Sequence, residues 1–271
     1  MSFLDMILEG KRDLVRQKKK GLPLCDLVSL TKGRGREGLF LASFSERFAK
    51  QVKIVAEVKR ASPSRGALCA ADRDIAGTIA AYETGGASAI SVLTEESHFK
   101  GSLDDLAVAR EATELPVLRK DFIVDPYEIH EAAAFGADAV LLIAEALERE
   151  ELEDLAALAF SIGLDVLLEI HGRESFERTA HIGGVLTGVN SRDLTTLSID
   201  LAKARDVVAT MPEDRPVIVE SGINGPSDIE LFRDLGVSGF LIGTALMHSP
   251  NPAQTLRRLT VKKEDDRPGA P

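Results

Sequence analysis

Six acidic, basic and amide side chains in this sequence stand inside or just after short apolar runs. They are Glu57, Lys59, Lys120, Glu169, Asn190 and Glu220. A lysine can donate a proton to an oxygen atom and a glutamate can remove one from carbon or nitrogen, and each such step accelerates a reaction by about 10²- to 10⁴-fold. Neighbouring lysines are expected to lower each other's pKa toward the working range and to attract an anion. The residue types therefore predict acid–base chemistry on an anionic substrate.

Eight apolar runs, separated by amphipathic segments, carry these residues. The runs cover residues 52–58, 89–93, 116–118, 139–143, 166–170, 186–189, 217–219 and 239–242. They start about 27 residues apart, which is the length of a strand, a helix and two short loops. An open doubly wound sheet is the alternative, but no G-x-G-x-x-G turn follows the first run. We predict an α/β protein, a (β/α)8 TIM barrel with an N-terminal helical extension.

Side chains that alternate along a strand decide which residues face the barrel interior. In the first run Lys53, Val55, Glu57 and Lys59 share one face, and the other face packs against helices. The remaining polar residues follow the third, fifth, sixth and seventh runs. Function in this fold sits at the carboxyl ends of the strands. A salt bridge at the rim explains one such residue, but six at equivalent positions of five strands indicate an active site.

Two glycine-bearing turns follow the seventh and eighth runs. The first begins with Ser221 and Gly222, and the second with Gly243 and Thr244, where a short helix can start. The loops after the last two strands form the usual phosphate site of this fold, because backbone N–H groups and a helix N-terminus favour an anion. The alternative is that the glycines only permit tight turns. We favour phosphate binding.

Residues 1–50 do not belong to the repeat. Residues 2–18 carry the apolar stripe of a helix, residues 33–36 interrupt the chain, and residues 41–50 are predicted to form a second, short helix. We expect this extension to pack on one end of a catalytic barrel formed by residues 51–260. The polar tail, residues 261–271, is expected to fray.

The overall charge argues against two classes of partner. With 33 basic and 43 acidic residues, the formal net charge is −10, and such a chain repels the phosphates of a nucleic acid unless its basic residues are segregated. The first residues include acids where a signal peptide needs a basic start, and the longest uncharged stretch, 235–256, is interrupted by polar residues. We expect no nucleic-acid partner, no membrane contact and a cytoplasmic protein.

Metal-binding and cofactor patterns are missing from the sequence. Cys25 and Cys69 are too few for a disulfide framework or a cysteine-based zinc site. The histidines share no metal-ligand spacing with a carboxylate, so surface roles are expected for His98, His130, His171, His181 and His248. We predict that the protein uses neither a metal ion nor an organic cofactor.

Five motifs resemble those of the indole-3-glycerol phosphate synthase family. They read Ala-Glu-Val-Lys-Arg-Ala-Ser-Pro-Ser-Arg-Gly at residues 56–66, Ser-Val-Leu-Thr-Glu-Glu at 91–96 with Phe99 and Gly101 beyond, Leu-Arg-Lys-Asp-Phe-Ile-Val at 118–124, Gly-Val-Asn-Ser-Arg-Asp-Leu at 188–194 and Val-Glu-Ser-Gly-Ile at 219–223. The resemblance runs from about residue 3 to residue 259, and the first motif is highly specific. It implies a (β/α)8 barrel whose N-terminal extension lies over the catalytic face. It also implies an activity in tryptophan biosynthesis, the conversion of 1-(2-carboxyphenylamino)-1-deoxyribulose 5-phosphate to indole-3-glycerol phosphate, carbon dioxide and water.

The resemblance implies roles for the polar residues. Lys120 is similar to the general acid that protonates the substrate carbonyl, and Glu169 to the general base of the later dehydration. Lys59 matches a lysine that engages the substrate's anionic groups and assists as an acid. Glu57 holds the lysines, while Glu220 and Asn190 position substrate and lysines.

Binding roles are implied in the same way. Phe99 and Phe122 would pack on the aromatic ring of the substrate. Phosphate and other substrate contacts are implied for Ser62, Arg192, Ser221, Gly222, Gly243 and Thr244. Many family members have serine where this chain has Thr244, which keeps the hydroxyl group and the backbone N–H. The roles of Arg60 and Arg65 stay open.

Three alternatives are weighed against this assignment. Another ribulose-phosphate barrel enzyme, such as phosphoribosylanthranilate isomerase, lacks both the 57–64 segment and the long extension. A Schiff-base aldolase would use Lys120 as a nucleophile. A non-catalytic phosphosugar-binding barrel would not need a complete set of acid, base and phosphate groups. We expect a small anionic substrate and a monomer, with weak contact to other tryptophan-pathway enzymes left open.

Overall fold

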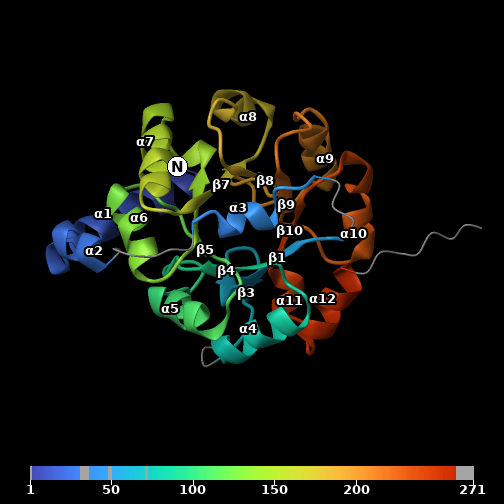
Figure 1. The fold of residues 1–271 in the computed structure, drawn as a ribbon, viewed down its shortest axis with the longest axis horizontal. Coiled ribbons are helices and arrows are strands. Elements are labelled where there is room, and N and C mark those ends of the chain that lie inside the picture. Colours follow the sequence, from blue (N-terminus) through green and yellow to red (C-terminus); the bar gives the residue numbers. More distant parts are fainter. Residues whose placement is uncertain (1, 31–36, 48–50, 71–72, 261–271) are drawn as a thin grey trace, which may run out of the picture.

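Eight parallel strands form a closed barrel in this computed structural model, which describes residues 2–30, 37–47, 51–70 and 73–260 (Figure 1). The barrel strands are β1 (Ile54–Val58), β4 (Ala89–Leu93), β5 (Val117–Lys120), β6 (Ala139–Ile143), β7 (Asp165–Ile170), β8 (Leu186–Asn190), β9 (Val217–Glu220) and β10 (Gly239–Ile242). The barrel closes where β10 pairs with β1, with Val55 opposite Leu241. The predicted (β/α)8 fold is confirmed.

Three candidate site residues are the last residues of their strands. Lys120 pairs with Leu93 in the ladder between β4 and β5, and Asn190 pairs with Glu220 between β8 and β9. The predicted runs ended one or two residues too early at these positions, because the runs were defined by apolar residues and the last residues of these strands are polar. Strand hydrogen bonds therefore hold the backbone of these residues rigidly.

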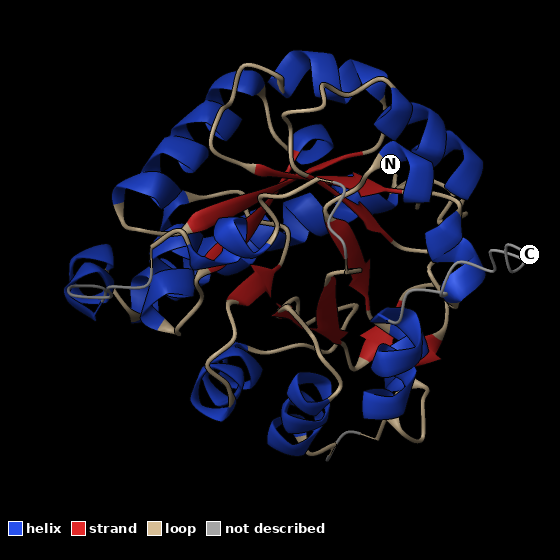
Figure 2. Cartoon of the chain, turned by 45° about the vertical axis from the view of Figure 1, so that its right-hand side comes forward, coloured by secondary structure: helices blue, strands red, loops and turns tan. Residues whose placement is uncertain are grey.

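Helices surround the barrel, as the blue helices around the red strands show in Figure 2. They are α4 (Ile75–Thr84), α5 (Leu103–Ala112), α6 (Pro126–Ala134), η1 (Ala144–Ala146), α7 (Arg149–Ser161), α8 (Arg173–Thr179), α9 (Leu201–Ala209), α10 (Pro226–Glu230), η2 (Arg233–Leu235), α11 (Thr244–Met247) and α12 (Pro252–Thr260). In α7, Leu152, Leu155, Ala156 and Ala159 are buried. This stripe faces the barrel and leaves the acidic face of the helix to solvent.

A small hairpin follows β1 and was not predicted. It consists of β2 (Ala61–Ser62) and β3 (Gly66–Ala67), with Ser62 opposite Gly66. The backbone of Gly66 has a φ of 68°, a left-handed conformation that glycine adopts without strain. Two-residue strands leave no periodicity in the sequence, so the hairpin could not be recognised there.

The N-terminal extension contacts both ends of the barrel. Its helices are α1 (Phe3–Gly21), α2 (Leu24–Leu30) and α3 (Leu39–Ser43). Helices α1 and α2 pack against α6, whereas α3 packs at the start of β7, where the Leu41 N–H donates a hydrogen bond to Asp165 Oδ2 at 2.9 Å. The amino ends of the strands lie opposite the catalytic face. The chain therefore runs from the region of α6 to the amino-terminal end of the barrel before β1 begins.

The helix predicted over residues 41–50 is wrong in its bounds. It begins at Leu39 and ends at Ser43, because Phe44 leaves the helical conformation, with φ of −123° and ψ of 12°, and its N–H donates a hydrogen bond to the Leu41 carbonyl. Residues 48–50 lie outside the described residues, as do the interruption predicted at 33–36 and the tail 261–271. In the described part of the chain, helices are too short or too polar to cross a bilayer.

Candidate active site

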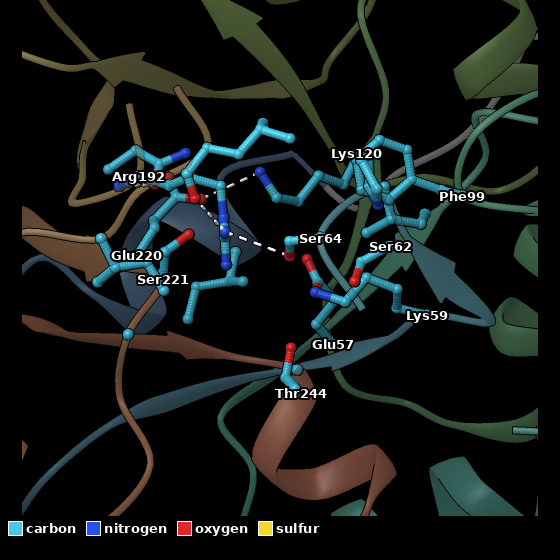
Figure 3. Close-up of a pocket in the computed structure, with 18 of the residues that line it drawn as sticks. Glu57, Lys59, Ser62, Ser64, Phe99, Lys120, Arg192, Glu220, Ser221 and Thr244 are labelled. Atoms are coloured by element: carbon cyan, nitrogen blue, oxygen red, sulfur yellow. Dashed lines mark hydrogen bonds and ion pairs between the residues drawn. The ribbon is translucent and has the colours of Figure 1, made fainter. Parts of the chain in front are cut away.

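The residues predicted to react or bind lie around one pocket at the carboxyl ends of the strands (Figure 3). Its lining includes Glu57, Lys59, Ser62, Phe99, Lys120, Phe122, Glu169, Asn190, Arg192, Glu220, Ser221, Gly222, Gly243 and Thr244. These residues are far apart in the sequence. They meet because all eight strands of the barrel are parallel and end at the same face.

Two lysine–glutamate groups form the polar floor of the pocket. Lys120 Nζ lies 3.0 Å from Glu169 Oε2 and 3.1 Å from Glu220 Oε2. Lys59 Nζ lies 2.6 Å from Glu57 Oε1. The three carboxylates are at most 3% exposed. Such buried charges are stable only when paired, and each carboxylate here has a lysine partner.

The pKa of Lys120 is shifted in the opposite direction to the one expected from neighbouring lysines. Burial disfavours its charge, but Glu169, Glu220 and Glu57 outweigh burial and raise the Lys120 pKa above its usual value. The prediction of a lowered pKa is wrong for this residue, because three carboxylates surround the ammonium group. Lys120 therefore carries a proton at neutral pH and is suited to donate one.

The two glutamates beside Lys120 have opposite tendencies. Burial alone would raise the Glu169 pKa, but the charges of Lys120 and His171 and a hydrogen bond from Asn190 lower it overall. Burial also acts on Glu220, and with the nearby Glu169 it raises the Glu220 pKa to about 7 in spite of Lys120. Glu169 is thus ionised and able to accept a proton, whereas Glu220 titrates near neutral pH.

Aromatic side chains line another wall. The rings of Phe99 and Phe122 lie 6.2 Å apart between centroids, and Phe3 of α1 also lines the pocket. Figure 3 places Phe99 and Arg192 on opposite sides of the site. Phe3 was not recognised as a site residue because it belongs to an apolar helical stripe. The pocket thus has an aromatic wall suited to a planar ring and polar walls suited to charged groups.

The turns after β9 and β10, where anion binding is predicted, line the pocket. The backbones of Ser221 and Gly222 are both left-handed, with φ of 64° and 77°, and turns that contain left-handed residues can present backbone N–H groups to an anion. Helix α11 starts just after Gly243, and the first N–H groups of a helix have no partner within it. Ser62 Oγ is buried and has no hydrogen-bond partner among the described residues. These groups can bind a phosphate together.

Two arginines, whose roles the sequence left open, occupy different positions. Arg60 makes a two-pronged ion pair with Asp105 of α5, at 2.7 and 2.8 Å, and lies outside the pocket lining. Arg65 lines the pocket, together with Ser64, whose Oγ is 3.4 Å from Arg192 Nη1. Both arginines lie in a loop, where the sequence has no periodicity that could distinguish their roles. We therefore assign Arg60 to structure and Arg65 to the site.

The surface position expected from the sequence is wrong for one histidine. His171 follows β7 directly, its side chain is only 13% exposed, and it lies between Glu145 and Glu169. The expected surface role is therefore wrong for His171. Spacing in the sequence could not reveal this position, because Glu145 comes from η1 on the neighbouring βα unit. Among the described residues, histidine, cysteine and acidic side chains form no group of three suited to a metal ion.

Gly188 of β8 is required by the position of Glu220. A Cβ atom at residue 188 would overlap Glu220 Oε1 and lie 3.2 Å from Leu167 Cδ1. We expect Gly188→Ala to displace the Glu220 carboxylate from Lys120 and to lower kcat by about tenfold or more, because small errors in placing catalytic groups are costly. Steady-state kinetics measure the change. Gly183→Ala is the control, since a Cβ there meets no atom within 4 Å; equal kcat in both variants would refute the idea.

Fold and site together define a class. The chain is a (β/α)8 barrel whose pocket, at the carboxyl ends of the strands, contains buried lysine–glutamate pairs and two glycine-bearing turns. The family model of indole-3-glycerol phosphate synthase matches residues 4–259, and the chain belongs to this family.

Curated relatives of the same family match nearly the whole chain. Proteins named indole-3-glycerol phosphate synthase from Verminephrobacter eiseniae (strain EF01-2) and Desulfosudis oleivorans (strain DSM 6200 / JCM 39069 / Hxd3) are 42% and 41% identical, each covering 95% of this chain and 98% of the relative. One from Mycolicibacterium gilvum (strain PYR-GCK) is 43% identical and covers 95% and 93%. The predicted family resemblance is confirmed.

Two solved structures share the fold. Thiamine phosphate pyrophosphorylase from Pyrococcus furiosus has a TM-score of 0.57 at 18% identity, covering 77% of this chain and 93% of that one. N-acetylmannosamine-6-phosphate 2-epimerase from Clostridium perfringens also has a TM-score of 0.57, at 17% identity, covering 80% and 94%. At these identities the likeness concerns the barrel alone.

Proposed function

We propose that this protein is a carboxy-lyase that converts 1-(2-carboxyphenylamino)-1-deoxyribulose 5-phosphate to indole-3-glycerol phosphate. The observation that carries the proposal is the contact of protonated Lys120 with ionised Glu169, at 3.0 Å, in a pocket with an aromatic wall and an anion site. Family membership of the chain supports the same reaction. The substrate has a matching set of groups: an aromatic ring, a carboxylate, a ketone and a phosphate.

We place the substrate by matching groups of like chemistry. The ring packs on Phe99 and Phe122, and the phosphate binds at the turns after β9 and β10 together with Ser62. Lys59, which reaches the pocket beside Glu57, faces the substrate carboxylate. This placement brings the ketone toward Lys120, so binding energy at the two ends of the substrate orients the reacting atoms.

The first step forms a carbon–carbon bond. The ring carbon that bears the carboxylate attacks the ketone carbon, while Lys120 donates a proton to the ketone oxygen. Loss of carbon dioxide then breaks the bond to the carboxylate and returns its electron pair to the ring, which becomes aromatic again. Glu57 and Glu220 hold the lysines during these steps, and Asn190 holds the carboxylate of Glu169.

The second step removes water. Glu169 takes a proton from the methylene carbon that lies between the nitrogen and the carbon bearing the hydroxyl group. The hydroxyl group leaves as water with a proton from Lys59. The electron pair forms the double bond of the indole. Because the substrate carboxylate leaves as neutral carbon dioxide, each turnover takes up one proton from solvent.

A Schiff-base role for Lys120 is less well supported. A lysine nucleophile must be deprotonated. Here the carboxylates around Lys120 raise its pKa, which favours a proton donor over a nucleophile.

The direct test is product formation by the purified protein, without added metal ion or cofactor. We expect indole-3-glycerol phosphate to appear and to be followed by its fluorescence, because the chain contains no tryptophan that would contribute background. Mass spectrometry identifies the product. If a sample shown to be folded forms no indole-3-glycerol phosphate at saturating substrate, the proposed function is refuted.

We further propose a cytoplasmic monomer with at most weak contact to other tryptophan-pathway enzymes. Both cysteines are free thiols, which is usual in a reducing compartment. Within the chain we propose three parts, an extension of residues 1–50, the catalytic barrel of residues 51–260 and a tail of residues 261–271. Sedimentation of the purified protein tests the oligomeric state.

A further inference from the structure

Among the described residues, His171 is the histidine that lies next to Glu169 of the lysine–glutamate centre, and the mechanism above does not use it. It follows the last residue of β7, so a barrel strand holds its backbone. Its Nε2 atom lies 3.5 Å from Glu169 Oε1. This atom is buried and has no hydrogen-bond partner among the described residues, and Glu169 offers it an acceptor.

Glu145 fixes the orientation of the His171 ring. The Glu145 Oε2 atom lies 2.9 Å from His171 Nδ1, and Glu145 Oε1 accepts a hydrogen bond from the His171 backbone N–H at 3.0 Å. Glu145 belongs to η1, which Arg178 of α8 clamps by donating hydrogen bonds to the carbonyls of Ala144 and Leu147. With Nδ1 on Glu145, only Nε2 is left to face Glu169.

The two oxygens of the Glu169 carboxylate therefore have different neighbours. Oε2 contacts Lys120, and Oε1 faces His171. We propose that His171 is a positioning residue for Glu169, holding one carboxylate oxygen while Lys120 holds the other. This inference rests on the proposed function, in which Glu169 removes a proton from the substrate.

The charges around the ring give the expected direction of a pH effect. The groups that face His171 are Glu145 of η1, Glu169 of β7 and, through space, Glu220 of β9. Burial lowers the His171 pKa, but the hydrogen bond to Glu145 and the charge of Glu169 raise it overall. The cation in turn lowers the Glu169 pKa. Removal of the ring should therefore raise the Glu169 pKa and move the acid limb of kcat to higher pH.

A pair of variants separates position from charge. The amide nitrogen of glutamine occupies the place of Nε2, and that of asparagine the place of Nδ1. We expect His171→Asn to lower kcat about tenfold, and His171→Gln to stay within about threefold of the wild type, because only glutamine keeps a donor toward Glu169. Both variants lose the cation, so both should move the acid limb to higher pH. His181→Asn is the control, since His181 pairs with Glu153 at 2.7 Å outside the pocket.

Glu145→Gln is a second variant in case His171→Asn does not fold, and it should lower kcat in the same way. An activity-independent readout is the His171 pKa from NMR, which should fall in Glu169→Gln. An unchanged His171 pKa in Glu169→Gln, or an unchanged acid limb with kcat within twofold in His171→Asn, would overturn the inference. Absence of product from the wild type would instead refute the proposed function, while the NMR titration would still decide the contact.

Discussion

Replacement of Lys120 by alanine should lower kcat by about 10²- to 10⁴-fold while binding changes by only a few-fold. Lys120 is the group in contact with both Glu169 and Glu220, and its raised pKa keeps it in the proton-donating form. Without it, the ketone oxygen must take up negative charge unaided as the ring closes. The aromatic wall and the proposed anion site remain, and we expect these to supply most of the affinity.

Two measurements separate chemistry from binding. Single-turnover kinetics give the rate of ring closure, and calorimetry with a substrate whose ketone is reduced to an alcohol gives the affinity without reaction. Lys120→Met keeps most of the side-chain volume and shows whether packing contributes. Lys203→Ala, at an exposed lysine of α9, is the matched control. A Lys120→Ala variant that keeps more than a tenth of the wild-type kcat would exclude Lys120 as the general acid.

Glu169→Gln should stop the reaction after ring closure. Glutamine has nearly the same shape and can still contact Lys120, but it cannot accept a proton, so dehydration should slow by about 10²- to 10⁴-fold. Carbon dioxide is released before that step. We therefore expect a burst of carbon dioxide from carboxyl-labelled substrate, with indole fluorescence appearing much later.

Rapid quenching resolves this order of events. The ring-closed, decarboxylated intermediate should accumulate to nearly one equivalent of enzyme and be detected by mass spectrometry. Glu230→Gln, at an exposed residue of α10 that pairs with Arg233, should behave like the wild type. Normal indole formation by Glu169→Gln with no trapped intermediate would rule out the assigned role.

The sequence by itself determined the barrel and the inward-facing residues of its first strand. Alternation along β1 places Glu57 and Lys59 on one face, and the regular spacing of apolar runs with intervening helices requires parallel strands. Parallel strands in a barrel end at one face, so the polar residues at the strand ends were expected to meet there. The other members of the site came from the family resemblance or from the structure. Both kinds of pattern are local properties of the chain, and the structure agrees with them.

Contacts between elements were decided only by the tertiary structure. The extension contacts both ends of the barrel, Phe3 enters the pocket, and Arg60 turns away toward Asp105. None of these contacts leaves a periodic signal, because each joins a loop or helix to a surface that forms only after the barrel closes.

The protonation states depend on the same long-range contacts. The pKa of Lys120 rises because β1, β7 and β9 bring Glu57, Glu169 and Glu220 around it, and His171 is buried because η1 brings Glu145 to its ring. Electrostatic energies vary with distance and burial. Residue types and spacing thus predicted which groups react, while barrel closure sets the distances that decide which of them donates a proton and which accepts one.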